Sequence, residues 1–317
     1  MYIYMDVALK FSCRACGKCC RNDWQVTVDE ESYQRNAELF LKVGAQAEFQ
    51  RAFVPLQGRK SLEEYAYIAK RPGGGCWFLT ADNLCRLQQQ AGHSHLDAVC
   101  QIFPRYPMNT ARGIELTLSF SCPSVLKMVS RIEPLTIIRS DHALLDFTPS
   151  AYAVDVYPSQ QPLFSPLRHY FELEQHFIDI LQCRGMTIVE RLNLMQATID
   201  AVMTLKHDEH FNRNLTSLLY HNYDLLDDAL EPVRTDCYTP DILLEHFLVN
   251  FVFKKPFYTY GLRRSLLILE HIWRYIESIR KQAIDEITDM EFTEKAIRDV
   301  EFQYGHNRRA LLQQIKC

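Results

Sequence analysis

The sequence predicts a mainly α-helical protein with a cysteine-rich first part, and three observations support this fold class. Apolar residues recur at helical spacing over most of the second half of the chain. Eight of the 11 cysteines lie between Cys13 and Cys122. A stretch with several prolines and β-branched residues, 135–166, follows them. We therefore predict a cysteine-rich metal-binding domain with few short strands over residues 1–130, and a mainly helical domain over residues 131–317.

Length and composition place the chain among ordered globular proteins. Its 317 residues are enough for one large domain or two smaller ones. Hydrophobic residues make up 47% and charged residues 23%, so a sizeable core is available. The net charge of -4 implies no broad basic surface, and we expect no nucleic-acid partner.

Neither export nor membrane insertion is expected. Residues 1–6 lack the basic start and the apolar run of a secretory signal. The most apolar later segment, 242–272, is interrupted by charged side chains and falls short of the ~20 apolar residues that span a bilayer. We therefore expect a cytoplasmic protein. In that reducing compartment, clustered cysteines serve more often as metal ligands or redox catalysts than as disulfide partners.

One helix is expected within the cysteine-rich domain, from about Glu30 to Phe53. Asp29 or Thr27 would cap its first turn, because their side-chain oxygens accept hydrogen bonds from free amides. Its spacing places three apolar residues on one face: Leu39, Val43 and Ala47. The Arg-Pro-Gly-Gly-Gly segment at 71–75 then ends any regular structure.

Four helices are expected in the helical domain, after short strands or an irregular connector over 135–166. The first two have apolar faces formed by Leu173, Phe177, Ile180 and Leu181, and by Ile188, Leu192, Met195, Ile199 and Val202. The other two are predicted at Pro240–Phe253 and Leu262–Ala283.

The strongest chemical signal is the run Cys13-Arg-Ala-Cys16-Gly-Lys-Cys19-Cys20. A spacing of two residues lets a tight turn direct two thiolates at one metal or cluster, and basic neighbours favour the thiolate form. Adjacent Cys19 and Cys20 point in different directions in most backbone conformations. One of them is therefore expected to serve another centre or not to be a ligand. The alternative, a set of free buried thiols, is hard to justify for so dense a run.

Four later cysteines complete the predicted set of metal ligands: Cys76, Cys85, Cys100 and Cys122. Each has aromatic or apolar neighbours, which shield and tune a metal cluster, although any one of them alone also suits an ordinary buried cysteine. Zinc and iron–sulfur clusters both accept four thiolates. The C-x2-C-x2-C run with a distant Cys122-Pro123 resembles the bacterial ferredoxin arrangement, so we favour a [4Fe–4S] cluster and keep zinc as the alternative. The C-x3-C-x2-C spacing of the common radical S-adenosylmethionine enzymes is absent.

Several segments also carry a family resemblance: 5–13, the run 13–20, Trp24–Asp29, Asn83–Cys85, Cys100–Arg105, Leu244–Lys254 and about Glu301–Asn307. In these segments the chain resembles the CxxCxxCC family of zinc- or iron-chelating proteins, and within it the flagellin lysine N-methylases. The resemblance covers most of the chain and is looser from about 126 to 240. It implies methyl transfer from S-adenosylmethionine to a lysine of a protein such as flagellin, in a family associated with an iron–sulfur cluster.

The binding site for the methyl donor is not evident from the sequence. No glycine-rich loop follows a clear strand, as it does in Rossmann-type methyltransferases, and Gly73–Gly75 suits a flexible connector better. Arg105 is the predicted cofactor-binding residue, because its guanidinium suits a carboxylate or cluster sulfurs; a structural ion pair is the alternative. No catalytic residue is predicted.

Two histidine pairs are weaker candidates for metal ligands: His93 with His95, and His207 with His210. Solvated side chains are the simpler interpretation of both. A second hypothesis for the whole chain is a non-catalytic protein that binds zinc or iron, or transfers electrons, and docks a partner through its helical half.

Overall fold

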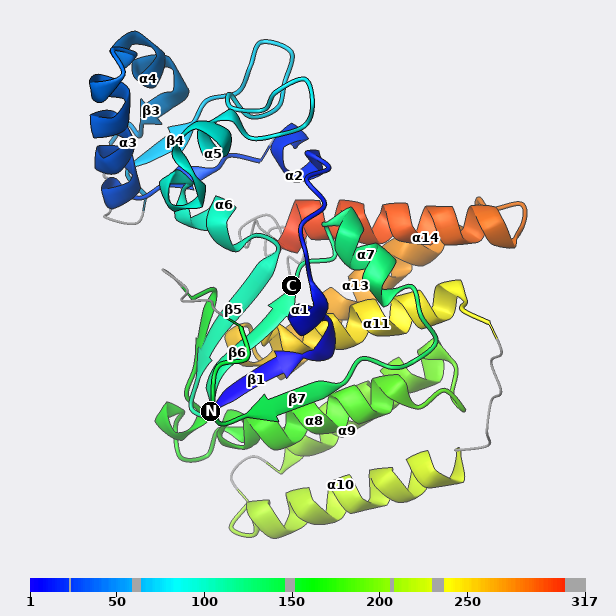
Figure 1. Cartoon of the computed structure of the whole chain (residues 1–317). Helices are drawn as coiled ribbons and strands as arrows, with labels where there is room; N and C mark the ends of the chain where they lie inside the picture. Colours follow the sequence, from blue (N-terminus) through cyan, green and yellow to red (C-terminus); the bar gives the residue numbers. More distant parts are fainter. Residues whose placement is uncertain (23, 59–63, 146–151, 206–207, 230–236, 306–317) are drawn as a thin grey trace.

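The computed structural model describes residues 1–22, 24–58, 64–145, 152–205, 208–229 and 237–305 (Figure 1). Helices account for 57% of these residues, and the strands are short. The predicted mainly α-helical class is therefore confirmed. No helix in this part of the chain is long and apolar enough to cross a bilayer.

A five-stranded sheet combines strands from both sides of residue 130. Its order is β7-β1-β6-β5-β8. The strands are β1 (Tyr2–Met5), β5 (Arg105–Thr110), β6 (Gly113–Leu118), β7 (Ile137–Ser140) and β8 (Val154–Val156). β1 runs parallel to β6, with Tyr2 opposite Ile114, and antiparallel to β7. β5 pairs antiparallel with β6 in a hairpin and parallel with β8.

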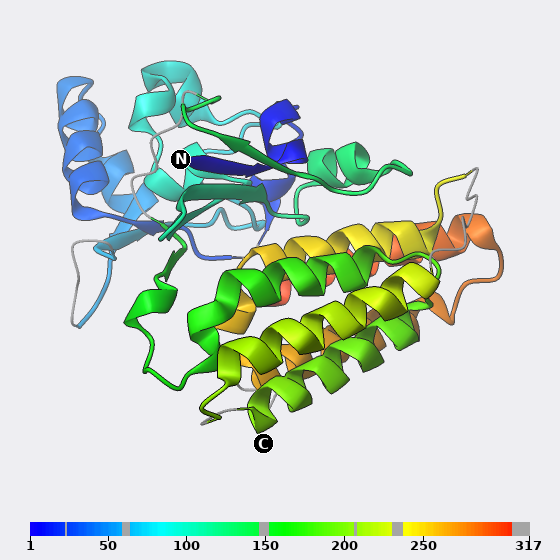
Figure 2. The ribbon, with the colours of Figure 1, turned by 90° about the horizontal axis from the view of Figure 1, so that it is seen from below.

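The helices of the second half pack against one another below this sheet (Figure 2). They are α8 (Tyr170–Gln182), α9 (Ile188–Thr204), α10 (Phe211–Asp228), α11 (Pro240–Phe253), α12 (Pro256–Thr259), α13 (Leu262–Arg280) and α14 (Glu286–Val300). The predicted apolar faces of α8 and α9 are buried at every named position. The predicted helices at Pro240 and Leu262 are also confirmed. The patterns did not predict α10 or α14.

α11 shows why its bounds could be read from the sequence. Thr239 caps the helix by accepting a hydrogen bond from the Ile242 amide, and Pro240 occupies its first turn, where a missing amide proton costs nothing. Side chains on all sides of α11 are buried, as expected for a helix that is apolar all round.

A small unit with its own core lies to one side of the sheet (Figure 1). It contains β2 (Thr27–Val28), α3 (Glu30–Lys42), α4 (Gln46–Ala52), β3 (Phe53–Pro55) and β4 (Ala66–Ile68). Its three strands pair in the order β2-β4-β3, and all pairings are antiparallel. Aromatic rings pack closely in its core, with Phe49 and Phe53 stacked at 4.9 Å between centroids.

The single helix predicted from Glu30 to Phe53 is wrong, because the chain turns between α3 and α4. Gly44 has φ +70°, a left-handed conformation that ends one helix and changes the direction of the chain. The predicted inner face fails for the same reason, since Val43 is 67% exposed whereas Phe40 is buried. Of the two predicted caps, Asp29 is correct: its carboxylate accepts the Ser32 amide at 2.7 Å.

The remaining elements are short. They are α1 (Asp6–Lys10), α2 (Lys18–Arg21), α5 (Arg86–Ala91), η1 (His93–His95), α6 (Ala98–Ile102), α7 (Pro123–Val129), η2 (Pro158–Gln160), η3 (Pro166–His169) and η4 (Glu301–Gly305). The connector over 135–166 contains the predicted short strands, β7 and β8, and irregular chain wherever it is described, together with the 3-10 turn η2 and the start of η3.

The described residues form two hydrophobic cores. The larger extends from Ile3 in β1 to Val300 in α14, and the smaller from Val28 to Leu87. The division into folding units at residue 130 stays a prediction.

A buried ionic cluster ties the sheet to the helices. Lys255 is fully buried and donates to Glu115 in β6 at 2.7 Å and to Glu174 in α8 at 2.6 Å. Arg112 donates to the same two carboxylates and covers the ring of Phe171 at 3.9 Å. Each of the two carboxylates is thus paired with both cations. Charged groups can be buried when they are paired in this way.

Candidate metal centre

The first cysteine run forms a tight turn that leads into α2. Ala15 and Gly17 both have positive φ, at 50° and 66°, and they turn the chain between Cys13 and Cys19. The sulfurs of Cys19 and Cys20 lie 3.8 Å apart. The expectation that these neighbours point apart is therefore wrong. A short helix starting at Lys18 brings the two thiols together.

The contact between Cys19 and Cys20 shifts the pKa values of the two thiols in opposite directions. A hydrogen bond from the Cys20 thiol lowers the pKa of Cys19 to about 7. The same contact, with burial, raises the pKa of Cys20 above its usual range. The pair thus favours one thiolate and one thiol, so Cys19 is the more nucleophilic and the better ligand of the two near neutral pH.

Cys76 and Cys85 approach this turn through backbone contacts. The Cys76 amide donates a hydrogen bond to the Cys20 carbonyl at 2.6 Å. A Cβ atom at Gly17 would lie 2.8 Å from the Cβ of Asn83, two residues before Cys85. Gly17 is therefore needed for the segment that carries Cys85 to lie close to the first cysteine run. Gly73–Gly75 form a turn between Lys70 and Cys76, which pair in an isolated bridge.

Cys100 reaches the same region from α6. Burial raises its pKa well above the usual value, and so do the charges of Asp97, Cys76, Cys85 and Cys19. Asp97 caps α6 and is itself 2% exposed, and burial raises its pKa to about 7.

Cys122 lies at the junction of β6 and α7, where it precedes the first residue of the helix. Burial raises its pKa, opposed by backbone hydrogen bonds, and the charges of Cys16 and Cys19 raise it further. Besides burial and hydrogen bonding, the charges of Cys16, Cys19, Cys76, Cys85 and Cys100 contribute to the raised pKa of Cys20, Cys76, Cys100 or Cys122. We call these seven cysteines the thiol network.

Arg105 provides the link to the eighth cysteine, Cys13. It begins β5, directly after a cis Phe103–Pro104 peptide, and its guanidinium lies over the Phe11 ring at 5.6 Å. Burial lowers the pKa of Arg105, and the charge of Cys13 opposes that shift. A guanidinium close to a thiolate supplies positive charge beside an anionic centre.

The described thiols are not arranged as a complete set of ligands around one metal ion. Within the described ranges, no group of three or more His, Cys, Asp or Glu side chains is placed so that it could hold a metal ion. Tetrahedral zinc with Zn–S bonds of about 2.3 Å needs sulfurs about 3.8 Å apart. Cys19 and Cys20 have this separation. All ten cysteines in the described ranges are free thiols, so the donor chemistry fits a thiolate-ligated metal or cluster.

Aromatic side chains cover one side of the first run. Trp24 donates its indole N–H to the Cys19 carbonyl at 2.9 Å. Its ring meets Phe103 at 5.4 Å and Phe302 at 5.2 Å, both edge to face. The sequence patterns did not indicate Phe302, because nothing local in the sequence links residue 302 to residue 24.

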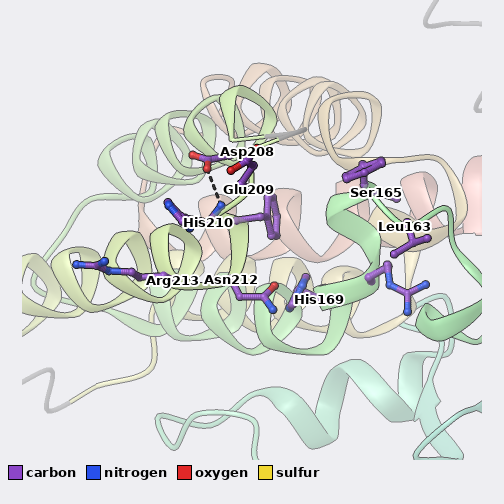
Figure 3. A pocket seen from close by; sticks show the side chains of 11 residues that line it. Leu163, Ser165, His169, Asp208, Glu209, His210, Asn212 and Arg213 are labelled. Carbon is purple, nitrogen blue, oxygen red and sulfur yellow. Dashed lines mark hydrogen bonds between the residues drawn. The ribbon is translucent and has the colours of Figure 1, made fainter.

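The histidine pairs gain no support as metal ligands. His93 and His95 lie on η1, outside any group that could hold a metal among the described residues. His207 lies outside the described residues, whereas His210 lines a pocket (Figure 3).

That pocket has a volume of about 640 Å³ and lies at the starts of α8 and α10. Two exposed apolar residues, Leu163 and Phe164, form part of its lining, together with Arg168, His169, Asp208 and Arg213 (Figure 3). No cysteine lines it. It is therefore separate from the thiol network, and the sequence patterns did not indicate it.

Comparison with known proteins gives partial similarity to lysine methylases. The chain is 26% identical over 163 residues to "Lysine-N-methylase" of Salmonella typhimurium (strain LT2), a region that is 49% of this chain and 38% of that protein. The corresponding protein of Salmonella choleraesuis is 26% identical over 162 residues, with the same coverage. The match thus spans about two fifths of the length of these relatives.

A further relative has a flagellar name. "Flagellar biosynthetic protein FliU" of Salmonella muenchen is 28% identical over 126 residues, which are 38% of this chain and 70% of that protein. No family model matches the chain. No solved structure is similar to it.

Proposed function

We propose that the chain is a protein lysine N-methylase that uses S-adenosylmethionine and carries a thiolate-ligated metal centre, of the [4Fe–4S] type. One observation carries the proposal: the first cysteine run lies against the segments that carry later cysteines, with the Cys76 amide on the Cys20 carbonyl at 2.6 Å and Gly17 against Asn83, two residues before Cys85. The similarity to lysine N-methylases over about half of the chain supports the reaction. The flagellar name of one relative supports a flagellar protein as the substrate, and flagellin is the one we propose.

The ligands of the centre come from the eight cysteines of the first 122 residues. Among them, the sulfurs of Cys19 and Cys20 lie 3.8 Å apart, and the Cys76 amide donates to the Cys20 carbonyl. The charges of Cys16 and Cys19 act on Cys122, and the charge of Cys13 acts on Arg105. An iron–sulfur cluster supplies redox chemistry or an open coordination position for a carboxylate or amine group of the donor.

The protein residues around the centre have separate tasks. Arg105 offsets the negative charge of the thiolates and offers a two-pronged donor to a carboxylate. Trp24, packed between Phe103 and Phe302, holds the Cys19 carbonyl through its indole N–H. In the reaction itself, the lysine gives a proton to water, and its nitrogen bonds to the methyl carbon as the bond from that carbon to the donor sulfur breaks. The sulfonium donor leaves as a neutral thioether.

One observation favours the alternative, a metal-binding or electron-transfer protein without methylase activity. The three consecutive glycines form a turn at Cys76 instead of a loop between a strand and a helix, so they offer no nucleotide-type donor site. Donor binding therefore separates the two hypotheses.

The test uses anaerobically purified full-length chain, methyl-labelled S-adenosylmethionine and flagellin. The proposal predicts label on flagellin lysines with the parent chain, and loss of labelling in Cys100→Ser. Cys237→Ser, which changes an exposed cysteine of the helical half, is the matched control and should label as the parent does. A metal-loaded parent chain that neither binds the donor nor labels flagellin would overturn the methylase and leave the alternative.

A further inference from the structure

The turn that follows α14 connects two regions that are far apart in the sequence. This turn, η4, is a π-helical turn of Glu301–Gly305. π-Helical turns are rare and occur often at functional sites, because the wider turn redirects consecutive side chains. Here Glu301 and Phe302 contact different parts of the protein.

Glu301 anchors the turn inside the main core. It is 3% exposed, and Lys254 at the end of α11 donates to both of its carboxylate oxygens at 2.7 Å. Ser119 donates to the same carboxylate at 2.7 Å, and the hydroxyl of Ser121 lies 2.7 Å from that of Ser119. Ser121 directly precedes Cys122. The hydrogen bonds of Glu301 therefore reach the segment after β6 that leads to Cys122.

Phe302 extends from the same turn to the first cysteine run. Its ring meets the Trp24 ring at 5.2 Å and an interplanar angle of 83°. Phe103 packs on Trp24 in the same way, at 5.4 Å and 81°. Trp24 is therefore held between two rings, and its N–H is directed at the Cys19 carbonyl at 2.9 Å.

The contacts of Cys19 and Cys20 extend this path to the other cysteines. The Cys20 carbonyl accepts the Cys76 amide, so the peptide groups of both residues are held by hydrogen bonds from outside the run. The first two cysteines of the same loop, Cys13 and Cys16, are exposed. The orientation of the Cys19 backbone decides where its sulfur lies, because only one side-chain torsion separates the sulfur from the main chain.

We propose that Trp24 and Phe302 are positioning residues for the metal centre, which hold Cys19 through its carbonyl, and that Glu301 anchors Phe302 for this task. The proposal rests on the metal centre of the proposed function. It assigns to the last described turn of the chain a role in a site built almost entirely from the first 122 residues.

The test compares the rate at which a chelator removes metal from anaerobically isolated full-length variants. Trp24→Phe keeps a ring between Phe103 and Phe302 but removes the N–H donor. Phe302→Leu keeps an apolar side chain but removes the edge-to-face contact. Each should speed metal release by about tenfold, the lower end of the effect of losing a partner outside the ligand shell.

Phe211→Leu is the control, because Phe211 makes a similar ring contact with His169 at 5.3 Å, at the pocket away from the cysteines. It should release metal within twofold of the parent rate. Urea unfolding of the metal-free proteins supplies the second readout, and Trp24→Phe should leave its midpoint unchanged.

Two results would overturn the positioning role alone: release at the parent rate in both variants, or faster release that simply follows a loss of stability in the metal-free Trp24→Phe protein. A parent chain that contains no metal at all would instead overturn the metal centre itself. The failure of the two proposals can thus be told apart.

Discussion

Gly17 lies directly against Asn83, because a Cβ atom at Gly17 would come within 2.8 Å of the Asn83 Cβ. This contact joins the first cysteine run to the turn before Cys85. Gly17 also has φ +66°, so both the backbone and the available space require glycine.

Replacing Gly17 by Ala should therefore reduce metal binding as well as stability. The left-handed backbone alone costs a residue with a side chain about 1–2 kcal/mol. The close contact adds to this by moving the two loops apart. We expect the metal content of Gly17→Ala to fall to less than half of the parent value, measured by elemental analysis after anaerobic purification.

Gly44→Ala is the matched control. Gly44 has a similar φ of +70°, but a Cβ atom there would meet nothing within 4 Å. It should lose about 1 kcal/mol of stability and keep its metal. Equal metal contents in the two variants would contradict the role given to the Gly17–Asn83 contact.

Removing the buried cation Lys255 should strongly destabilise the fold. Lys255→Met leaves Glu115 and Glu174 buried, with Arg112 as their remaining cation. Breaking a buried ion pair in this way costs about 3–5 kcal/mol. Urea unfolding measures the change. Arg263→Met, which breaks the exposed pair with Asp200, should cost no more than about 1 kcal/mol. Similar losses in both variants would contradict the account of this cluster.

His176 should make the stability of the protein depend on pH. Its imidazole is fully buried, its Nε2 lies 3.0 Å from Asn222 Nδ2, and burial lowers its pKa to about 4. The unfolded chain takes up a proton near pH 6.5, whereas the folded chain does so only near pH 4. The stability contributed by neutral His176 is thus present above pH 6.5 and is lost as the pH falls toward 4.

The measurement is the free energy of unfolding between pH 4.5 and 7 for the parent chain and for His176→Gln. The parent should lose more stability than the variant on going to pH 4.5, by roughly 2–3 kcal/mol from a shift of this size. Parallel curves for the two proteins would show that His176 does not contribute to the acid response.

The sequence predicted those parts of the fold that depend on local patterns. α11 begins at a threonine cap followed by proline, and the apolar faces of α8 and α9 follow regular helical spacing. The break at Gly44 was missed because apolar residues on both sides of it happened to keep a spacing of four. The pairing of Tyr2 with Ile114 could not be predicted, since strand partners so far apart in the chain share no local signal.

In the site, too, local sequence patterns predicted some features, whereas those that depend on long-range packing were missed. The cysteine run and its later partners were evident from the type and spacing of residues, and in the structure the first run lies against the segments that carry Cys76 and Cys85. Their role as ligands stays a prediction. The contribution of Phe302 and Glu301 was not evident, because it depends on where α14 packs.

The most direct test of the metal centre is the metal and acid-labile sulfide content of anaerobically prepared Cys16→Ser and Cys100→Ser proteins. These residues come from segments that are far apart in the sequence, and Cys237→Ser again serves as the control. We predict iron and sulfide in the parent and the control, and loss of both in each of the two variants. A parent chain without metal, or variants that keep the parent content, would contradict a shared centre.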